Sequence, residues 1–255
     1  MRVLFVGDVV ASGGCDYLEK KLPALRKQLG VDVTVINGEN SADQNGISTD
    51  SARSLFSCGA DVITTGNHAF KQKNSLNLFD DDPNVLRPAN FHRSACGKGV
   101  CEIDMGRYRV AVVNLIGRAY MEPVDSPFDC IDGILKKIDT KNIIVDFHAE
   151  ATSEKRVMGF YLDGRVSAVV GTHTHVQTAD AQILKNGTAY ITDVGMVGSR
   201  YSVLGADVGC ATKKLVTSLP TRLDTAEAVD MEINAVLIEI DEKTGKAVSI
   251  EAIKA

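Results

Sequence analysis

Four of the five histidines follow hydrophobic runs and stand beside other residue types that bind metal ions. His68 follows Asn67, and His173 and His175 form a His-x-His pair. The donors gathered in this way are oxygen and nitrogen atoms of Asp8, Glu39, Asn40, Asn67, His148, His173 and His175. Carboxylate, amide and imidazole groups suit divalent iron, manganese and zinc. We therefore interpret them as a metal site whose ligands come from the whole length of the chain.

The number of donors is sufficient for two metal ions. Histidines two residues apart on an extended backbone point to the same face, so His173 and His175 are expected to approach one ion or two neighbouring ions. With a carboxylate at Asp8, a second at Glu39 that can bridge, and the Asn67 amide, the set can hold two divalent ions about 3.5–4 Å apart. Such a pair binds a phosphate oxygen, activates a water and offsets charge on the departing oxygen. The sequence thus predicts phosphoester hydrolysis.

Each of these residues also has a simpler explanation when it is taken alone. Asp8, Glu39 or Asn67 could be a polar residue at a strand end, and His148 could be a hydrogen-bonded core histidine. The recurrence of such residues at three strand ends, together with the His-x-His pair, favours a shared metal site.

Other polar residues have ordinary interpretations. We interpret His92 as a surface residue, Glu150 as a helix-start carboxylate and Lys155 as a solvated cation. Cys15 is interpreted as a small packing residue, although it could also line the site entrance and make activity sensitive to thiol reagents.

The first third of the chain alternates apolar runs with helical patterns. Runs at 2–7, 32–37 and 61–65 are apolar throughout, as in strands covered on both faces, and helices are predicted at 15–30 and 48–58. Each run ends in a glycine and a polar residue, namely Gly7-Asp8, Gly38-Glu39 and Gly66-Asn67. Because ligands of open α/β sheets gather at the carboxyl ends of the strands, we expect these residues to meet at one edge.

After Pro88 the pattern changes. We predict hairpins at 99–116, 181–192 and 231–253, strands at 143–148 and 166–171, and a helix at 128–138. Residues 119–130 are predicted as a loop that either caps the site, with Arg118 or Tyr120 touching substrate, or is a solvated connection. No internal repeat or linker interrupts the chain, so two packed sheets flanked by helices are expected in one domain spanning residues 1–255.

Composition limits the partners. The 28 basic and 33 acidic residues give a formal net charge of −5, which provides no field for an extended nucleic acid. The six cysteines show no CxxC spacing and are typical of a reducing compartment. No signal-peptide pattern and no apolar stretch near the roughly 18 residues of a membrane span is present, so we expect a cytoplasmic protein that does not enter a membrane.

The ordered set Gly7-Asp8, Gly38-Glu39-Asn40, Gly66-Asn67-His68, His148 and Gly171-Thr172-His173-Thr174-His175 resembles the calcineurin-like metallophosphoesterases. Within that superfamily, residues 37–40, 87–91, 146–155, 171–180 and 191–196 are similar to the YmdB-type subfamily of bacterial phosphodiesterases. The resemblance covers nearly the whole chain. It implies a four-layer α/β-β/α sandwich of two mixed sheets flanked by helices, a di-iron or di-manganese centre, hydrolysis of 2′,3′- and 3′,5′-cyclic nucleotides, and a homo-oligomer.

The resemblance also implies a role for each site residue. Asp8, Glu39 and His175 would hold one ion, with Asn40 near it. The second ion would be held by Glu39, Asn67, His148 and His173. His68 would face the substrate as proton donor to the leaving oxygen, although a structural histidine would look the same in sequence.

Two single residues and two short segments depart from familiar patterns. Most metallophosphoesterases have histidine where this chain has Val10, and aspartate where it has Glu39; both changes are typical of the subfamily. The residues 11–15 and the pair Ala69-Phe70 differ from the subfamily itself, which bears on substrate fit and rate more than on metal binding.

The sequence therefore supports two functions of different classes. The first is a binuclear metal phosphodiesterase in which a metal-activated hydroxide attacks phosphorus and His68 protonates the leaving oxygen. The second is a metal-dependent regulatory protein that binds a nucleotide or RNA with little turnover. A dinucleotide-binding oxidoreductase is poorly supported, because residues 7–13 lack the GxGxxG pattern.

Overall fold

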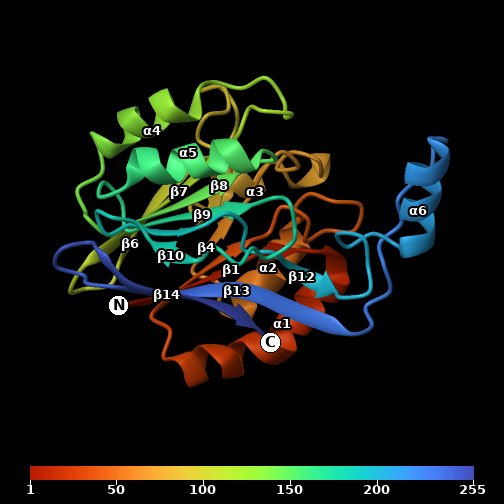
Figure 1. The fold of residues 1–255 in the computed structure, drawn as a ribbon, viewed down its shortest axis with the longest axis horizontal. Helices are drawn as coiled ribbons and strands as arrows, with labels where there is room; N and C mark the ends of the chain where they lie inside the picture. The colour runs from red at the N-terminus through yellow and green to blue at the C-terminus, as the bar shows by residue number, and fades with distance from the viewer.

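The computed structural model describes residues 1–255 and contains two mixed β-sheets stacked face to face between helices (Figure 1). In spatial order the first sheet consists of β2 (Asp8–Val9), β12 (Met196–Ser199), β13 (Met231–Ile240), β1 (Arg2–Val6), β3 (Val33–Asn37), β4 (Val62–Thr64) and β5 (Val85–Leu86), with β14 (Ala247–Lys254) paired to β13. The second sheet consists of β10 (Gln182–Ile183), β11 (Ala189–Ile191), β9 (Ala168–Thr172), β8 (Ile143–His148), β7 (Arg109–Ile116) and β6 (Val100–Asp104).

The helices cover the outer faces of the two sheets. The first sheet is covered by α1 (Ala11–Leu29), α2 (Thr49–Ser57) and the short α3 (Leu78–Asp81), which follows the single 3₁₀ turn η1 (Lys73–Ser75). The second sheet is covered by α4 (Pro127–Leu135) and α5 (Thr152–Leu162). The predicted four-layer α/β-β/α sandwich is confirmed.

Three apolar layers hold the sandwich together. In β1, Val3 and Phe5 point into the core between the sheets, whereas Leu4 and Val6 point into the layer shared with α1 and α2. A third layer lies between the second sheet and α4 and α5, and contains Ile131. Because both faces of each sheet are covered, the central strands are apolar at nearly every position rather than at alternate ones.

Parallel pairing brings strand ends to a common edge. In the first sheet β1, β3, β4 and β5 are parallel, and in the second sheet β7, β8, β9 and β11 are parallel. The two edges meet through polar groups: the Asn37 side chain at the end of β3 donates to the Asp146 carboxylate in β8 at 3.0 Å, and Thr64 at the end of β4 donates to the same carboxylate. The carboxyl ends of both sheets therefore face one site.

Most predicted elements are confirmed with small shifts at their ends. The predicted hairpins appear as the antiparallel pairs β6–β7, β10–β11 and β13–β14. The first helix begins at Ala11 instead of residue 15, so the segment 11–15 is the first turn of α1 and not a free turn. The elements that were not predicted include the short α3 and β5, as well as β12 and α6 (Val208–Thr217).

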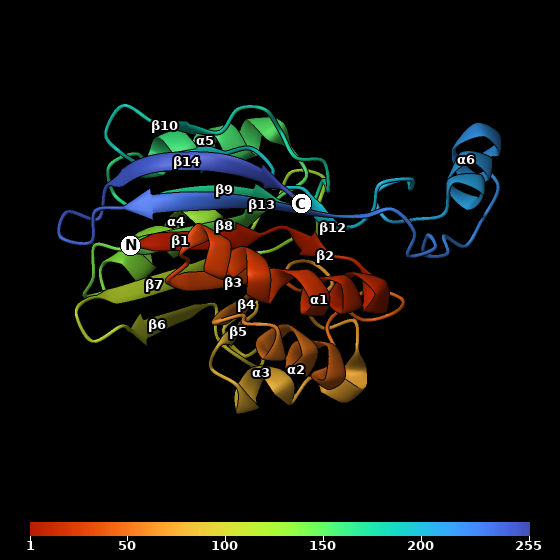
Figure 2. The same cartoon turned by 90° about the horizontal axis from the view of Figure 1, so that it is seen from below.

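Residues 200–230 form an arm that carries α6 away from the sheets (Figure 2). Leu215 and Val216 on α6 are 76% and 77% exposed, and Ala211 is the only buried residue of this helix. The helix therefore packs little against the sheets. None of the helices combines the length and the apolar character needed to cross a bilayer.

Gly7 permits the close approach of β1 to the chain before β12. A Cβ atom at Gly7 would lie 2.0 Å from the Gly195 carbonyl oxygen. We expect Gly7→Ala to lower the free energy of unfolding by about 1–3 kcal/mol, because the backbone must shift to relieve the overlap. Urea unfolding followed by circular dichroism measures this change.

The matched control is Gly133→Ala. A Cβ at Gly133 in α4 meets nothing within 4 Å, and alanine favours a helix over glycine by about 0.5–1 kcal/mol. Equal stabilities of the two variants would contradict the packing argument.

Candidate metal centre

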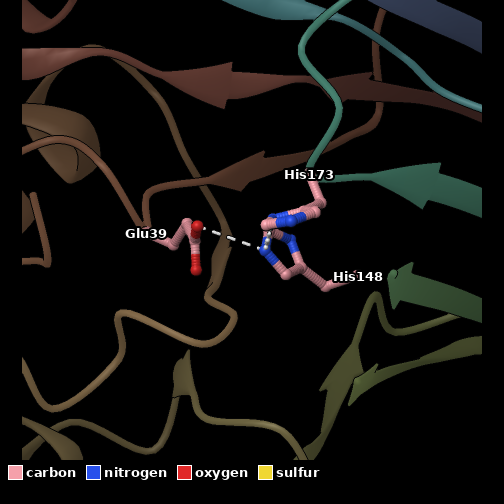
Figure 3. Close-up of side chains that lie close together, drawn as sticks. All are labelled: Glu39, His148 and His173. Atoms are coloured by element: carbon pink, nitrogen blue, oxygen red, sulfur yellow. Dashed lines mark hydrogen bonds and ion pairs between the residues drawn. The ribbon is translucent and has the colours of Figure 1, made fainter. Parts of the chain in front are cut away.

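The side chains predicted as metal ligands converge from both sheets at the common edge. Glu39 follows β3, His148 is the last residue of β8 and His173 follows β9. Their side chains point toward one another (Figure 3), with ligand atoms all within 4.8 Å of each other. His148 Nε2 lies 3.1 Å from Glu39 Oε1, 3.1 Å from Asn67 Oδ1 and 3.0 Å from His173 Nδ1. These four residues form one half of the candidate centre.

The other half contains Asp8, Asn40 and His175. His175 Nε2 lies 3.7 Å from Asp8 Oδ1 and 3.2 Å from Asn40 Nδ2. Asn40 Nδ2 also donates to Glu39 Oε1 at 3.2 Å. Glu39 therefore contacts residues of both halves, as a bridging carboxylate must.

Hydrogen bonds behind the histidines determine which ring nitrogens face the centre. The Thr172 hydroxyl donates to Asp146 Oδ1 at 2.7 Å, so at 2.9 Å it accepts the Nδ1–H of His148 and leaves Nε2 for the centre. His175 Nδ1 donates to the Leu204 carbonyl at 2.9 Å, which leaves its Nε2 beside Asp8. Both rings are thus oriented as ligands.

The residues fit a divalent metal ion. Asp8, Glu39 and His148 are completely buried, and Asp8 Oδ1 has no hydrogen-bond partner in the protein. Burial raises the pKa of Asp8, and His175 and His148 offset this only in part. A buried carboxylate oxygen without a donor is costly unless a cation compensates it. Together with imidazole nitrogens and the Asn67 amide oxygen, Asp8 and Glu39 provide the donor types that iron and manganese accept.

The shifted pKa values of His148 and His173 in the metal-free chain also indicate a site that favours a cation. Burial opposes a charge on His148, but Glu39 and Asp8 raise the pKa of His148 to about 9. Burial and the adjacent His148 lower the pKa of His173 to about 3. In the metal-free cluster a proton is thus favoured on His148 over His173, and a metal ion held by His148 would compete with that proton.

His68 lies beside the cluster at the surface of a cleft. Its side chain is 25% exposed, and its backbone N–H donates to Glu39 Oε2 at 3.1 Å. His68 Nδ1 lies 2.8 Å from Asn40 Oδ1, and because an amide oxygen only accepts, Nδ1 carries a hydrogen. Nε2 makes no hydrogen bond to the protein.

The cleft has a volume of about 500 Å³ and runs between the candidate centre and the arm. Its lining includes His68, His173 and His175 on one side, and Leu204, Lys214, Leu215 and Leu223 on the other. The sequence did not indicate the arm as part of the site, because these residues carry no recognisable chemical motif. Asn67 instead lines a neighbouring pocket of about 300 Å³ with His173 and Tyr120.

Three interpretations made from the sequence are wrong. The His-x-His segment is not extended, since His173 and His175 have φ angles of 98° and 63° where the chain turns after β9. The two rings consequently reach different halves of the centre. Lys155 is not solvated, because α5 places its Nζ in the core, 2.7 Å from Asp193. Glu150 precedes α5, and its Oε2 contacts His173 Nε2 at 3.1 Å.

Other residues lie where the sequence placed them. His92 is exposed and interacts with the Ser94 hydroxyl at 2.7 Å. In the loop before α4, Tyr120 is 92% exposed beside His173 and Asn67, whereas the Arg118 backbone is held by Glu154. Cys15 is buried and does not line the cleft.

The sequence model of the YmdB-like protein family matches residues 4–253. The chain belongs to the YmdB-like family. A Bacillus subtilis relative, named 2′,3′-cyclic-nucleotide 2′-phosphodiesterase, is 47% identical over 99% of this chain and 96% of its own length. A Mycoplasma pneumoniae structure described as a novel phosphatase superposes with a TM-score of 0.94 at 31% identity, covering 100% of this chain and 93% of the other.

The YmdB-like chain also shares its fold with a more distant structure. An NAD nucleotidase of Haemophilus influenzae covers 100% of this chain with 55% of its own, with a TM-score of 0.59 at 14% identity. That likeness shows the fold alone, and it agrees with the metallophosphoesterase sandwich described above.

The environment of Cys15 predicts an unreactive thiol. Burial raises the pKa of Cys15 to about 12, and its Sγ faces the Ser41 carbonyl. Because the thiolate is the nucleophile, we expect no alkylation of Cys15 by iodoacetamide at pH 8 in the folded chain, and full alkylation after unfolding in urea. Mass spectrometry of the Cys15 peptide decides this; labelling of the folded chain would show that the thiol is accessible.

The Thr172 hydroxyl is not a proposed ligand, but we expect its removal to weaken metal binding. Thr172→Val removes the acceptor for His148 Nδ1–H, so we expect affinity for Mn²⁺ to fall about 10–100-fold, measured by calorimetry. Thr188→Val is the control: it removes an equally buried hydroxyl, bonded to the Val166 carbonyl away from the site. Similar Mn²⁺ affinities of the two variants would be inconsistent with the assigned orientation of His148.

Proposed function

We propose that this chain is a binuclear metal-dependent phosphodiesterase that hydrolyses 2′,3′- and 3′,5′-cyclic nucleotides. The observation that carries the proposal is the convergence of buried carboxylate and imidazole donors, including an unpartnered Asp8 oxygen, at the end of a cleft. The name of the 47% identical Bacillus subtilis relative supports the hydrolysis of 2′,3′-cyclic nucleotides, whereas that of 3′,5′-cyclic nucleotides rests on the sequence resemblance. The sequence resemblance supports iron or manganese as the metal, with zinc compatible with the same donors.

The proposed ligands divide as the two halves of the centre do. Asp8, Glu39 and His175 would hold one ion, with Asn40 beside it. Glu39, Asn67, His148 and His173 would hold the other. When bound, the two ions supply Lewis-acid activation of water and compensation of phosphoryl charge.

His68 would protonate the leaving oxygen. In its imidazolium form, Nδ1–H donates to Asn40 Oδ1, which fixes the ring, and Nε2–H is free to donate. Asn40 thus positions His68 through its oxygen and contacts Glu39 and His175 through its nitrogen. This arrangement places a proton donor beside the proposed metal centre without making it a ligand.

The cleft supports a small substrate. Its volume of about 500 Å³ lies within the usual range for small-molecule sites, roughly 300–1,000 Å³. The aliphatic wall of Leu204, Leu215 and Leu223 can pack against a nucleoside, and Lys214 is the only Lys or Arg side chain in the lining. A single cation and a net charge of −5 favour a mononucleotide over an extended nucleic acid.

His68→Ala tests the proton donor. We expect kcat for 2′,3′-cyclic AMP to fall about 10²–10⁴-fold, because the departing alkoxide needs a proton. Hydrolysis of bis-p-nitrophenyl phosphate should fall much less, since p-nitrophenolate leaves without protonation. Elemental analysis should still find two metal ions per chain, because His68 is not a proposed ligand.

His92→Ala is the matched control, since His92 is exposed outside the cleft and should leave both rates unchanged. Cyclic AMP turnover by His68→Ala at the wild-type rate would exclude the assigned donor. Tight nucleotide binding by the wild-type chain without measurable turnover would instead support the regulatory binding function.

A further inference from the structure

Lys155 and Asp193 form a buried ion pair behind the candidate centre. Lys155 Nζ lies 2.7 Å from Asp193 Oδ2, and the two side chains are 1% and 0% exposed. Neither residue is a proposed ligand or lines the cleft. Burying two charges carries a desolvation cost that apolar residues would avoid, so such a pair is weak evidence for stability alone. The contacts of Asp193 indicate a different role.

Asp193 holds the residue between the two histidines of the His-x-His segment. Its Oδ2 accepts from the Thr174 backbone N–H at 3.0 Å and from the Thr174 hydroxyl at 2.7 Å. Lys155 Nζ also lies 3.4 Å from the Thr174 hydroxyl oxygen. Thr174 is therefore anchored through both its backbone and its side chain.

The residues on either side of Thr174 have an unfavourable backbone conformation. His173 and His175 have positive φ angles, which crowd the Cβ atom of any residue other than glycine. Such conformations persist only where surrounding contacts hold them. The bonds to Thr174 supply such contacts at the residue between the two histidines.

The second oxygen of Asp193 is connected through Gly195 to Asp8, the ligand contributed by the first sheet. Asp193 Oδ1 accepts from Gly195 N–H at 2.8 Å, and the Gly195 carbonyl accepts from Asp8 N–H at 3.0 Å. The His173 N–H in turn donates to Asp8 Oδ2 at 3.2 Å. These hydrogen bonds, together with the backbone that links His173 to Thr174, connect Asp193 to Asp8 and to the His-x-His segment.

We propose that Lys155 and Asp193 are positioning residues that hold Asp8, His173 and His175 in the arrangement required for metal binding. The Lys155 ammonium compensates the buried charge of Asp193, which then accepts from Thr174, Gly195 and Lys155 at once. The inference rests on the metal centre of the proposed function, and it does not depend on the substrate.

Metal affinity of the folded, metal-free chain tests the inference without reference to activity. We expect Asp193→Asn and Lys155→Met to bind Mn²⁺ about 10–100-fold more weakly than the wild type, the range found when groups that orient metal ligands are removed. Calorimetry and loss of the electron paramagnetic resonance signal of free Mn²⁺ measure the affinity. Far-UV circular dichroism of each metal-free variant verifies that it is folded.

Asp163→Asn is the matched control. Asp163 is a carboxylate at the end of α5 that accepts from the Asn186 and Thr188 backbone N–H groups and makes no bond to Asp193, Thr174 or Gly195. Its replacement should leave Mn²⁺ affinity unchanged, so a loss confined to the Lys155 and Asp193 variants supports a specific role.

Thr174→Val keeps the test decisive if the buried variants fail to fold. It removes only the hydroxyl bonds of a half-buried residue, and we expect weaker Mn²⁺ binding in a folded chain. Wild-type Mn²⁺ affinity in this variant, or in folded Asp193→Asn, would overturn the inference. Absence of Mn²⁺ binding by the wild type itself would overturn the proposed function as well, whereas binding without turnover would affect the function alone.

Discussion

The negative charge buried at the junction of the two sheets must be compensated, and this requirement explains the arrangement of the side chains around it. Asp8 and Glu39 are fully buried where the two sheets meet, and one Asp8 oxygen has no protein donor. Leaving such charge uncompensated would cost more free energy than single-site packing can offset. The chain gathers three histidines around the carboxylates, and the high pKa of His148 shows the same demand for positive charge. Divalent metal ions would meet that demand and displace the proton.

Near the candidate centre, glycine occupies positions where the backbone closely approaches a ligand side chain or another backbone segment. A Cβ at Gly66 would lie 2.2 Å from His148 Cδ2 and 2.3 Å from Glu39 Oε2. A Cβ at Gly171 would lie 1.8 Å from the Thr192 carbonyl oxygen, in the chain that leads to Asp193. Both glycines let backbone and ligands come together at the junction of the sheets, so the same positions serve packing and chemistry.

The two sheets and the arm have different parts in the proposed reaction. The sheets supply a rigid edge on which ligands are fixed by strand pairing and by hydrogen bonds from Asp146, Thr172 and Asp193. The arm lies across the cleft and contributes the Leu204 carbonyl that orients His175. A substrate in the cleft would therefore contact the candidate metal ligands on one side and aliphatic side chains on the other.

The layered fold and the candidate ligands could be predicted from the amino-acid sequence. Uninterrupted apolar runs reveal strands buried on both faces, and a polar residue recurring after such strands marks their shared edge, as at Asp8, Glu39 and Asn67. The positions that these side chains take in the site depend on tertiary contacts. The bonds of Thr174 to Asp193 at the left-handed turn between His173 and His175, the burial of Lys155 beside Asp193, and the placement of Leu204 behind His175 all join residues well separated in the chain. Local patterns report only which face of an element is apolar, whereas these contacts depend on how the faces of different elements come together.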